Sequence, residues 1–246
     1  MVSAARGSDD ALHAVGAPIG HEHADVTGGW LRPAVFGVMD GLVSNFALIA
    51  GVSGAGALPR TVALTGLAGL VAGAFSMAAG EYVSVASQSE SAQAELDLER
   101  LELQRNPEGE RAELAQVYID RGVDPQLALE VARQMSRDPV DALRVHALEE
   151  LGVDPAELPS PWIAAGSSFG AFVVGALLPL LPYLLGASNL AAAAIIALVA
   201  LFGTGALISR FTNRSWLYAG VRQLLLGVLA AAVTFGVGAA FGAAVT

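Results

Sequence analysis

The fold is decided by residues 163–209, IAAGSSFGAFVVGALLPLLPYLLGASNLAAAAIIALVALFGTGALIS, a stretch of 47 residues without Asp, Glu, Lys, Arg or His. A helix needs about 20 mainly apolar residues to cross the hydrocarbon core of a bilayer, so this stretch is too long for one crossing. Near its middle, Gly186-Ala187-Ser188-Asn189 supplies turn-forming residues. The stretch therefore predicts a hairpin of two membrane helices, at about residues 162–185 and 190–209.

Three other stretches are long and apolar enough to cross a membrane. They are Ala34–Leu58, Val62–Gln88 and Ser215–Val245. Hydrophobic residues make up 54% of the chain and charged residues 15%, against roughly 25% charged residues in a soluble domain. This composition excludes an ordinary soluble enzyme and predicts an all-α membrane protein with five transmembrane helices. The absence of cysteine excludes disulfide frameworks and thiol nucleophiles.

The charged residues are concentrated in one segment between the second and third predicted membrane helices. Residues 88–161 hold 17 of the 23 acidic residues and 7 of the 13 arginines, and so carry the whole net charge of −10. Such a chain has no basic surface for a nucleic-acid partner. We predict about four short helices over residues 89–157 of this acidic insert, and its three Asp-Pro pairs are typical of helix starts. The predicted helices are separated at Asn106-Pro107, Asp124-Pro125, Asp138-Pro139 and Asp154-Pro155.

The arginines predict the orientation in the membrane, because cytoplasmic loops carry an excess of positive charge. With a cytoplasmic N-terminus, every arginine except Arg60 lies on the cytoplasmic side. The opposite orientation would reverse this bias. We therefore expect the N-terminus and the acidic insert to face the cytoplasm.

Two acidic residues, Asp40 and Glu81, fall inside predicted membrane helices. A carboxylate in mid-membrane costs at least ~2.5 kcal/mol, so it needs a partner, a proton or a watery cavity. Glu81 shares one helix face with Met77, Ser84 and Gln88, and such a polar stripe suits a partly dehydrated divalent transition metal. The alternative is a protonated acid that is hydrogen-bonded to a neighbouring helix.

The acidic insert contains two glutamate pairs on either side of Pro107. They are Glu99 with Glu102, and Glu110 with Glu113. The i, i+3 spacing places both members of a pair on one helix face, and a turn at the proline allows four carboxylates to meet. His146 and Glu150, four residues apart, offer an imidazole and a further carboxylate to the same site. A solvated acidic face is the alternative interpretation.

Two longer motifs indicate a family. Asp40–Gly51, DGLVSNFALIAG, and Gly73–Ser84, GAFSMAAGEYVS, closely resemble the first and second helices of the vacuolar iron transporter family. The resemblance extends from about residue 28 to the C-terminus. It implies a homodimer whose first two helices line a metal path, and export of Fe²⁺, sometimes Mn²⁺, from the cytoplasm in exchange for protons.

The resemblance also implies which residues contact metal. In the membrane the family's metal-contacting residues match Asp40, Met77 and Glu81, and in the cytoplasmic helices they match Glu99, Glu102, Glu110, Glu113 and Glu150. Some members carry adjacent methionines just upstream of the last glutamate, whereas this chain has Val145-His146-Ala147. We therefore expect His146 to replace a methionine ligand.

These observations predict a proton-coupled divalent metal exporter and not an enzyme. Fe²⁺ is the expected cargo, with Mn²⁺ or Zn²⁺ as alternatives, and the expected partners are a second copy of the chain and the lipid bilayer. The alternative function is a membrane-anchored metal buffer or ferroxidase-like protein. An organic-solute transporter is disfavoured, because the last three membrane helices lack a charged or aromatic cluster.

The predicted domains are a disordered tail at residues 1–28, transmembrane helices at 29–88, a cytoplasmic metal-binding helical domain at 89–160 and transmembrane helices at 161–246. His21 and His23 in the tail are expected to bind metal weakly, if at all. All 13 basic residues are arginine, as in GC-rich bacterial genes, so we expect a bacterial inner membrane.

Overall fold

The computed structural model describes residues 29–186, 188–211 and 214–245, and the described residues form helices and connecting turns without a strand. Five helices are long and apolar enough to cross a membrane. They are α2 (Leu31–Gly54), α3 (Pro59–Arg105), α7 (Pro161–Leu184), α8 (Leu190–Ile208) and α9 (Trp216–Val245). The prediction of an all-α membrane protein with five such helices is confirmed. His21 and His23 lie outside the described residues.

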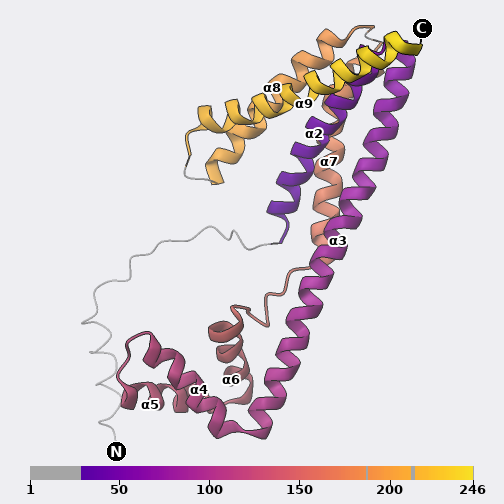
Figure 1. The fold of residues 1–246 in the computed structure, drawn as a ribbon. Coiled ribbons are helices and arrows are strands. Elements are labelled where there is room, and N and C mark those ends of the chain that lie inside the picture. Colours follow the sequence, from indigo (N-terminus) through magenta and orange to yellow (C-terminus); the bar gives the residue numbers. More distant parts are fainter. Residues whose placement is uncertain (1–28, 187, 212–213, 246) are drawn as a thin grey trace, which may run out of the picture.

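Helix α2 is the centre of the membrane bundle and packs against α3, α7 and α9 (Figure 1). Glycines allow this close approach: Gly41 lies against the α7 backbone at Phe172, and Gly51 lies against the α9 backbone at Thr234. A side chain at Gly41 would collide with main-chain atoms of α7, and one at Gly51 would crowd the carbonyl of Thr234. Small residues let membrane helices pack this closely. Helix α7 therefore covers one side of α2, and α3 and α9 pack on either flank of α2.

Helix α3 continues far beyond the membrane. The separate short helix predicted to follow Gln88 does not form, because the second membrane helix runs without interruption to Arg105. The reason is in the sequence: no Gly or Pro occurs between Gly80 and Pro107, and helix-favouring Ala, Glu, Gln and Leu fill the interval. The 47 residues span about 70 Å, so one rod joins the membrane bundle to the insert (Figure 1).

The insert then folds back along the end of α3 as three helices, α4 (Pro107–Asp120), α5 (Pro125–Met135) and α6 (Pro139–His146). A π-helical turn, η1 (Ala147–Leu151), extends α6. Each helix starts as the sequence predicts, because the side chains of Asn106, Asp124 and Asp138 accept hydrogen bonds from backbone N–H groups of the first turn. A small core lies between α4 and α5; it contains Leu114, Ala115, Ala128 and Ala132.

The helix start predicted at Asp154-Pro155 is wrong. Only a turn forms there, in which Asp154 accepts a hydrogen bond from the Ala156 N–H and another from Arg144. Pro159 and Pro161 follow closely, and prolines at these positions prevent a helix from continuing. The segment instead forms an extended connection into α7.

Candidate metal sites

The first candidate site lies in the insert, where three helices converge on the imidazole of His146. Its Nδ1 atom lies 3.0 Å from Oε1 of Glu150, 3.1 Å from Oε1 of Glu99 and 3.9 Å from Oε2 of Glu110. Ligand atoms of Glu99, Glu110 and His146 all lie within 4.8 Å of one another. Four potential metal ligands therefore face a common point, from α3, α4 and the α6–η1 segment.

This site is buried to an unusual degree for its charge. His146 is fully buried, and only 7% of Glu99 and 7% of Glu110 is exposed. Carboxylates are seldom buried so deeply unless a cation or a hydrogen-bond network compensates the lost hydration. Nε2 of His146 makes no hydrogen bond to any residue that the structure describes. Oε1 of Glu99 has the 3.1 Å contact with Nδ1 of His146 but no hydrogen bond to a described residue. A divalent cation among these oxygens would supply the missing compensation.

The remaining glutamates of the two pairs lie at the edge of this cluster. Glu102 and Glu113 are exposed. Both are close enough to act on the pKa of Glu150. The structure thus brings all five predicted insert glutamates and His146 together, with four ligand groups at the centre and two at the rim. We call these six residues the carboxylate cluster: Glu99, Glu102, Glu110, Glu113, His146 and Glu150.

Burial and mutual repulsion change the acidity of the cluster. Burial, followed by the charge of Glu150, raises the pKa of Glu99 from 4.5 to about 7, although His146 opposes the shift. Burial and the charges of Glu113 and Glu110 raise the pKa of Glu150 to about 7. The pKa of Glu110 is also raised, mainly by burial. A metal ion bound here would therefore compete with protons for the same oxygens near neutral pH.

The second candidate site is a cavity of about 230 Å³ in the membrane bundle, between α2, α3 and α7. Asp40 and Met77, both predicted from the sequence, line this cavity together. Its other lining residues are Ser44, Asn45, Leu48, Gly69, Gly73, Ser76 and Phe172. Asp40 is exposed on the surface of the single chain, so the cavity opens outward from α2. Carboxylate, thioether, amide and hydroxyl groups together suit a divalent transition metal.

Glu81 lies apart from this cavity. It is four residues beyond Met77 on α3, half-buried, and it is not among the residues that line the cavity. The predicted stripe on α3 is therefore present, since residues four apart share a helix face. The structure nevertheless brings only Met77 of that stripe to Asp40.

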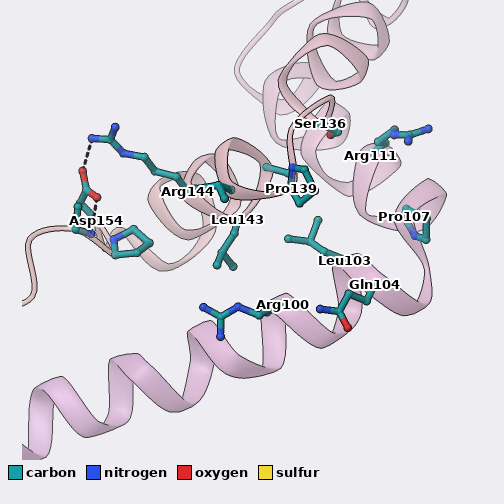
Figure 2. A pocket seen from close by; sticks show the side chains of 14 residues that line it. Arg100, Leu103, Gln104, Pro107, Arg111, Ser136, Pro139, Leu143, Arg144 and Asp154 are labelled. Atoms are coloured by element: carbon teal, nitrogen blue, oxygen red, sulfur yellow. Dashed lines mark hydrogen bonds and ion pairs between the residues drawn. The ribbon is translucent and has the colours of Figure 1, made fainter.

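A further cavity of about 570 Å³ belongs to neither site. It lies in the insert between α3, α4, α6 and the connection to α7, and Figure 2 shows its mainly apolar wall with arginines at the rim. Those arginines are already paired: Arg100 with Asp97, Arg111 with Glu108 and Arg144 with Asp154. None of the carboxylate cluster is among its lining residues.

Sequence reasoning missed one polar residue of the membrane bundle. Gln223 of α9 is only 4% exposed and lines a further cavity that also contains Asp40. The available signal was an amide inside an otherwise apolar helix. It was overlooked because Gln223 follows Arg222 and looks like the solvated start of the last membrane helix.

Comparison with known proteins gives a consistent result over most of the chain. The family model described as VIT family matches residues 31–239. The chain is 41% identical to a vacuolar iron transporter of Acanthamoeba castellanii over 226 residues, which cover 89% of this chain and 81% of the relative. It is 34% identical to vacuolar iron transporter 2 of Oryza sativa, over 84% of this chain and 85% of the relative. It is also 34% identical to vacuolar iron transporter 1 of Arabidopsis thaliana, over 83% of each.

Proposed function

Because the chain belongs to the VIT family, we propose that this multi-pass membrane protein exports a divalent metal ion, with Fe²⁺ as the main cargo, from the cytoplasm in exchange for protons. The names of its relatives support iron as the cargo. The single observation that carries the proposal is that Asp40 and Met77 line one cavity of the membrane bundle, so a carboxylate and a thioether meet at the same place.

The two candidate sites suit two successive steps in the transport of one metal ion, namely its capture and its passage through the membrane. Helix α3 carries Met77 in its membrane half and Glu99 and Glu102 in the insert. The carboxylate cluster collects metal on the side of the insert, and the Asp40 cavity passes the ion through the membrane. Gly29, just before α2, packs near Pro159, just before α7, so the start of α2 and the insert lie on one side of the membrane. The distribution of arginines makes that side the cytoplasm, of a bacterial inner membrane in our proposal.

Proton coupling follows from the chemistry of a carboxylate with few ligands around it. The carboxylate of Asp40 binds either a proton or a metal ion, since each neutralises the charge that attracts the other. Arrival of a proton from the outside would release the metal there, and loss of the proton inside would prepare the site for the next ion. Glu81, farther along α3, is a second group through which protons pass.

We further propose a homodimer with its two-fold axis along the exposed face of α2 and α3. Asp40 and Ser44 are exposed on the surface of the single chain. A carboxylate that faces lipid is costly, whereas a second copy of the chain would enclose it in a shared path. Two copies of Asp40 and Met77 would then contribute to one metal path.

Proteoliposomes test this function. With a pH gradient imposed, uptake of Fe²⁺, Mn²⁺ and Zn²⁺ is followed with a metal-quenched dye, and proton flux with a pH-sensitive dye in the same vesicles. We expect Fe²⁺ flux that is matched by an opposite proton flux. Metal flux without proton movement would contradict the coupling. Metal binding in the insert without any flux would favour the membrane-anchored buffer or ferroxidase-like protein.

A further inference from the structure

Asp40 lies between two cavities. The first, described above, is on the α3 side of α2. The second, of about 360 Å³, is on the α9 side and is lined by Val35, Phe36, Met39, Asp40, Val43, Gln223 and Leu226. Asp40 is the one residue that the two linings share. Asp40 therefore borders a cavity toward α3 on one flank and a cavity toward α9 on the other.

The two cavities offer Asp40 the same kinds of additional ligand. The α3-side cavity adds the thioether of Met77 and the amide of Asn45, and the α9-side cavity adds the thioether of Met39 and the amide of Gln223. Only four methionines occur in the 246 residues, and two of them line these cavities. A carboxylate, a thioether and an amide together favour a transition metal over Mg²⁺ or Ca²⁺, which prefer oxygen ligands alone.

Gln223 is a polar residue at a buried position of an otherwise apolar helix. Only 4% of it is exposed, and it lines the cavity together with Asp40 and Met39. On the α3 side, Asn45 donates a hydrogen bond of 2.7 Å to the carbonyl of Ala176, while its buried Oδ1 atom has no hydrogen-bond partner among the described residues. Each cavity therefore brings one amide side chain next to Asp40. Its place beside Asp40 and Met39 indicates a ligand in the cavity.

We propose that the α9-side cavity is a second binding position for the transported cation, formed by Asp40, Met39 and Gln223. This inference rests on the proposed transport function. The cation moves from one cavity to the other while the carboxylate of Asp40 holds it, so it exchanges the thioether and amide without full rehydration. Helix α9, outside the two helices that the sequence motifs mark, thereby takes part in selecting the metal.

A thiol probe tests the position of the cation directly. The chain has no cysteine, so Gln223→Cys introduces the only thiol, and its rate of reaction with N-ethylmaleimide is measured in detergent with and without Cd²⁺. We expect Cd²⁺ to slow labelling about tenfold, the lower end of affinity changes at metal sites, and Asp40→Asn in the same chain to remove this protection. Leu225→Cys, at an exposed position outside the cavity, is the matched control and should show no protection. Absence of labelling or of protection in the Gln223→Cys variant would overturn the proposal.

The role of the native Gln223 side chain is tested by measuring Mn²⁺ flux in variants that carry no introduced cysteine. Gln223→Leu keeps the volume and removes the amide, and it should lower flux at low Mn²⁺ about tenfold. Gln223→Glu, which keeps an oxygen ligand, should retain flux, and Leu225→Val, at an exposed position outside the cavity, should have no effect. Normal flux in the Gln223→Leu variant would overturn the second binding position, but it would leave the proposed transport function intact. Absence of flux in the unmodified protein would contradict the transport function, and the thiol measurement would still decide the cation position.

Discussion

The carboxylate cluster of the insert and the Asp40 cavities of the membrane bundle use similar ligands in opposite ways. In the cluster, ligands from three helices converge within 4.8 Å and are buried in a single chain. In the membrane, one exposed carboxylate is shared by two cavities with sparse neutral ligands. Many clustered charges bind a divalent ion tightly, whereas few ligands let it leave. This difference supports our proposal that the insert retains metal and the membrane bundle passes it on.

The most severe test of this division is Asp40→Asn. The change keeps the size and hydrogen bonding of the side chain but removes the charge for which metal and proton compete. We expect metal flux in proteoliposomes to fall to background, while calorimetry shows unchanged binding of Mn²⁺ to the insert. A parallel loss of insert binding would show that the two sites are not independent.

The converse change replaces the four paired glutamates, Glu99, Glu102, Glu110 and Glu113, with glutamine. In the unmodified protein, Mn²⁺ at a hundred times its Kd should stabilise the folded state by about 2.7 kcal/mol. The quadruple variant should lose this stabilisation in thermal unfolding, and flux should become slower but not stop. Unchanged stoichiometry of binding in calorimetry would mean that the acidic face is merely solvated.

The pH dependence sharpens the comparison on the side of the cluster. The pKa values of Glu99 and Glu150 are about 7 in the folded protein against an ordinary 4.5, so the folded state binds more protons between these values. Without metal, their contribution to stability is full below pH 4.5 and is lost as the pH rises through 7. Added Mn²⁺ should reverse this trend, so the rise in Tm with Mn²⁺ should be several degrees larger at pH 8 than at pH 5. A metal-induced rise that is independent of pH would contradict the raised pKa values.

The smallest expected effect concerns Met77. Met77→Leu preserves an apolar side chain of similar volume and removes the sulfur, which softer cations prefer. We expect Fe²⁺ flux to fall severalfold and Mn²⁺ flux to fall less. An equal loss for both metals would assign Met77 to packing.

The sequence was sufficient for much of this fold, because apolar length and helix capping are local properties. The uncharged run of residues 163–209 predicted its hairpin of helices, and Asp124 and Asp138 cap their helices as expected. The end of the second membrane helix was misplaced because polarity changes near Gln88 but no helix-breaking residue accompanies the change. Asp154-Pro155 failed as a helix start because its surroundings, Arg144 and the later prolines, override the local signal.

The candidate sites were less accessible to sequence reasoning. Spacing predicted which glutamates share a helix face, but it could not predict that His146 would be fully buried among them, since that depends on how α6 packs against α3. In the same way, Asp40 and Met77 were identified as individual residues from their helices. The pairing of Asp40 with Gln223, which are 183 residues apart, requires the tertiary fold.

The unbroken helix α3 fixes the separation of the two sites. Met77 and Glu99 are 22 residues apart on one helix, which corresponds to about 33 Å. The ligands of the cluster therefore cannot reach Asp40 or Met77 within one chain. In our proposal, an ion leaves the cluster completely and crosses this distance by diffusion before it enters the path, because a continuous helix cannot shorten to bring the two sites into contact.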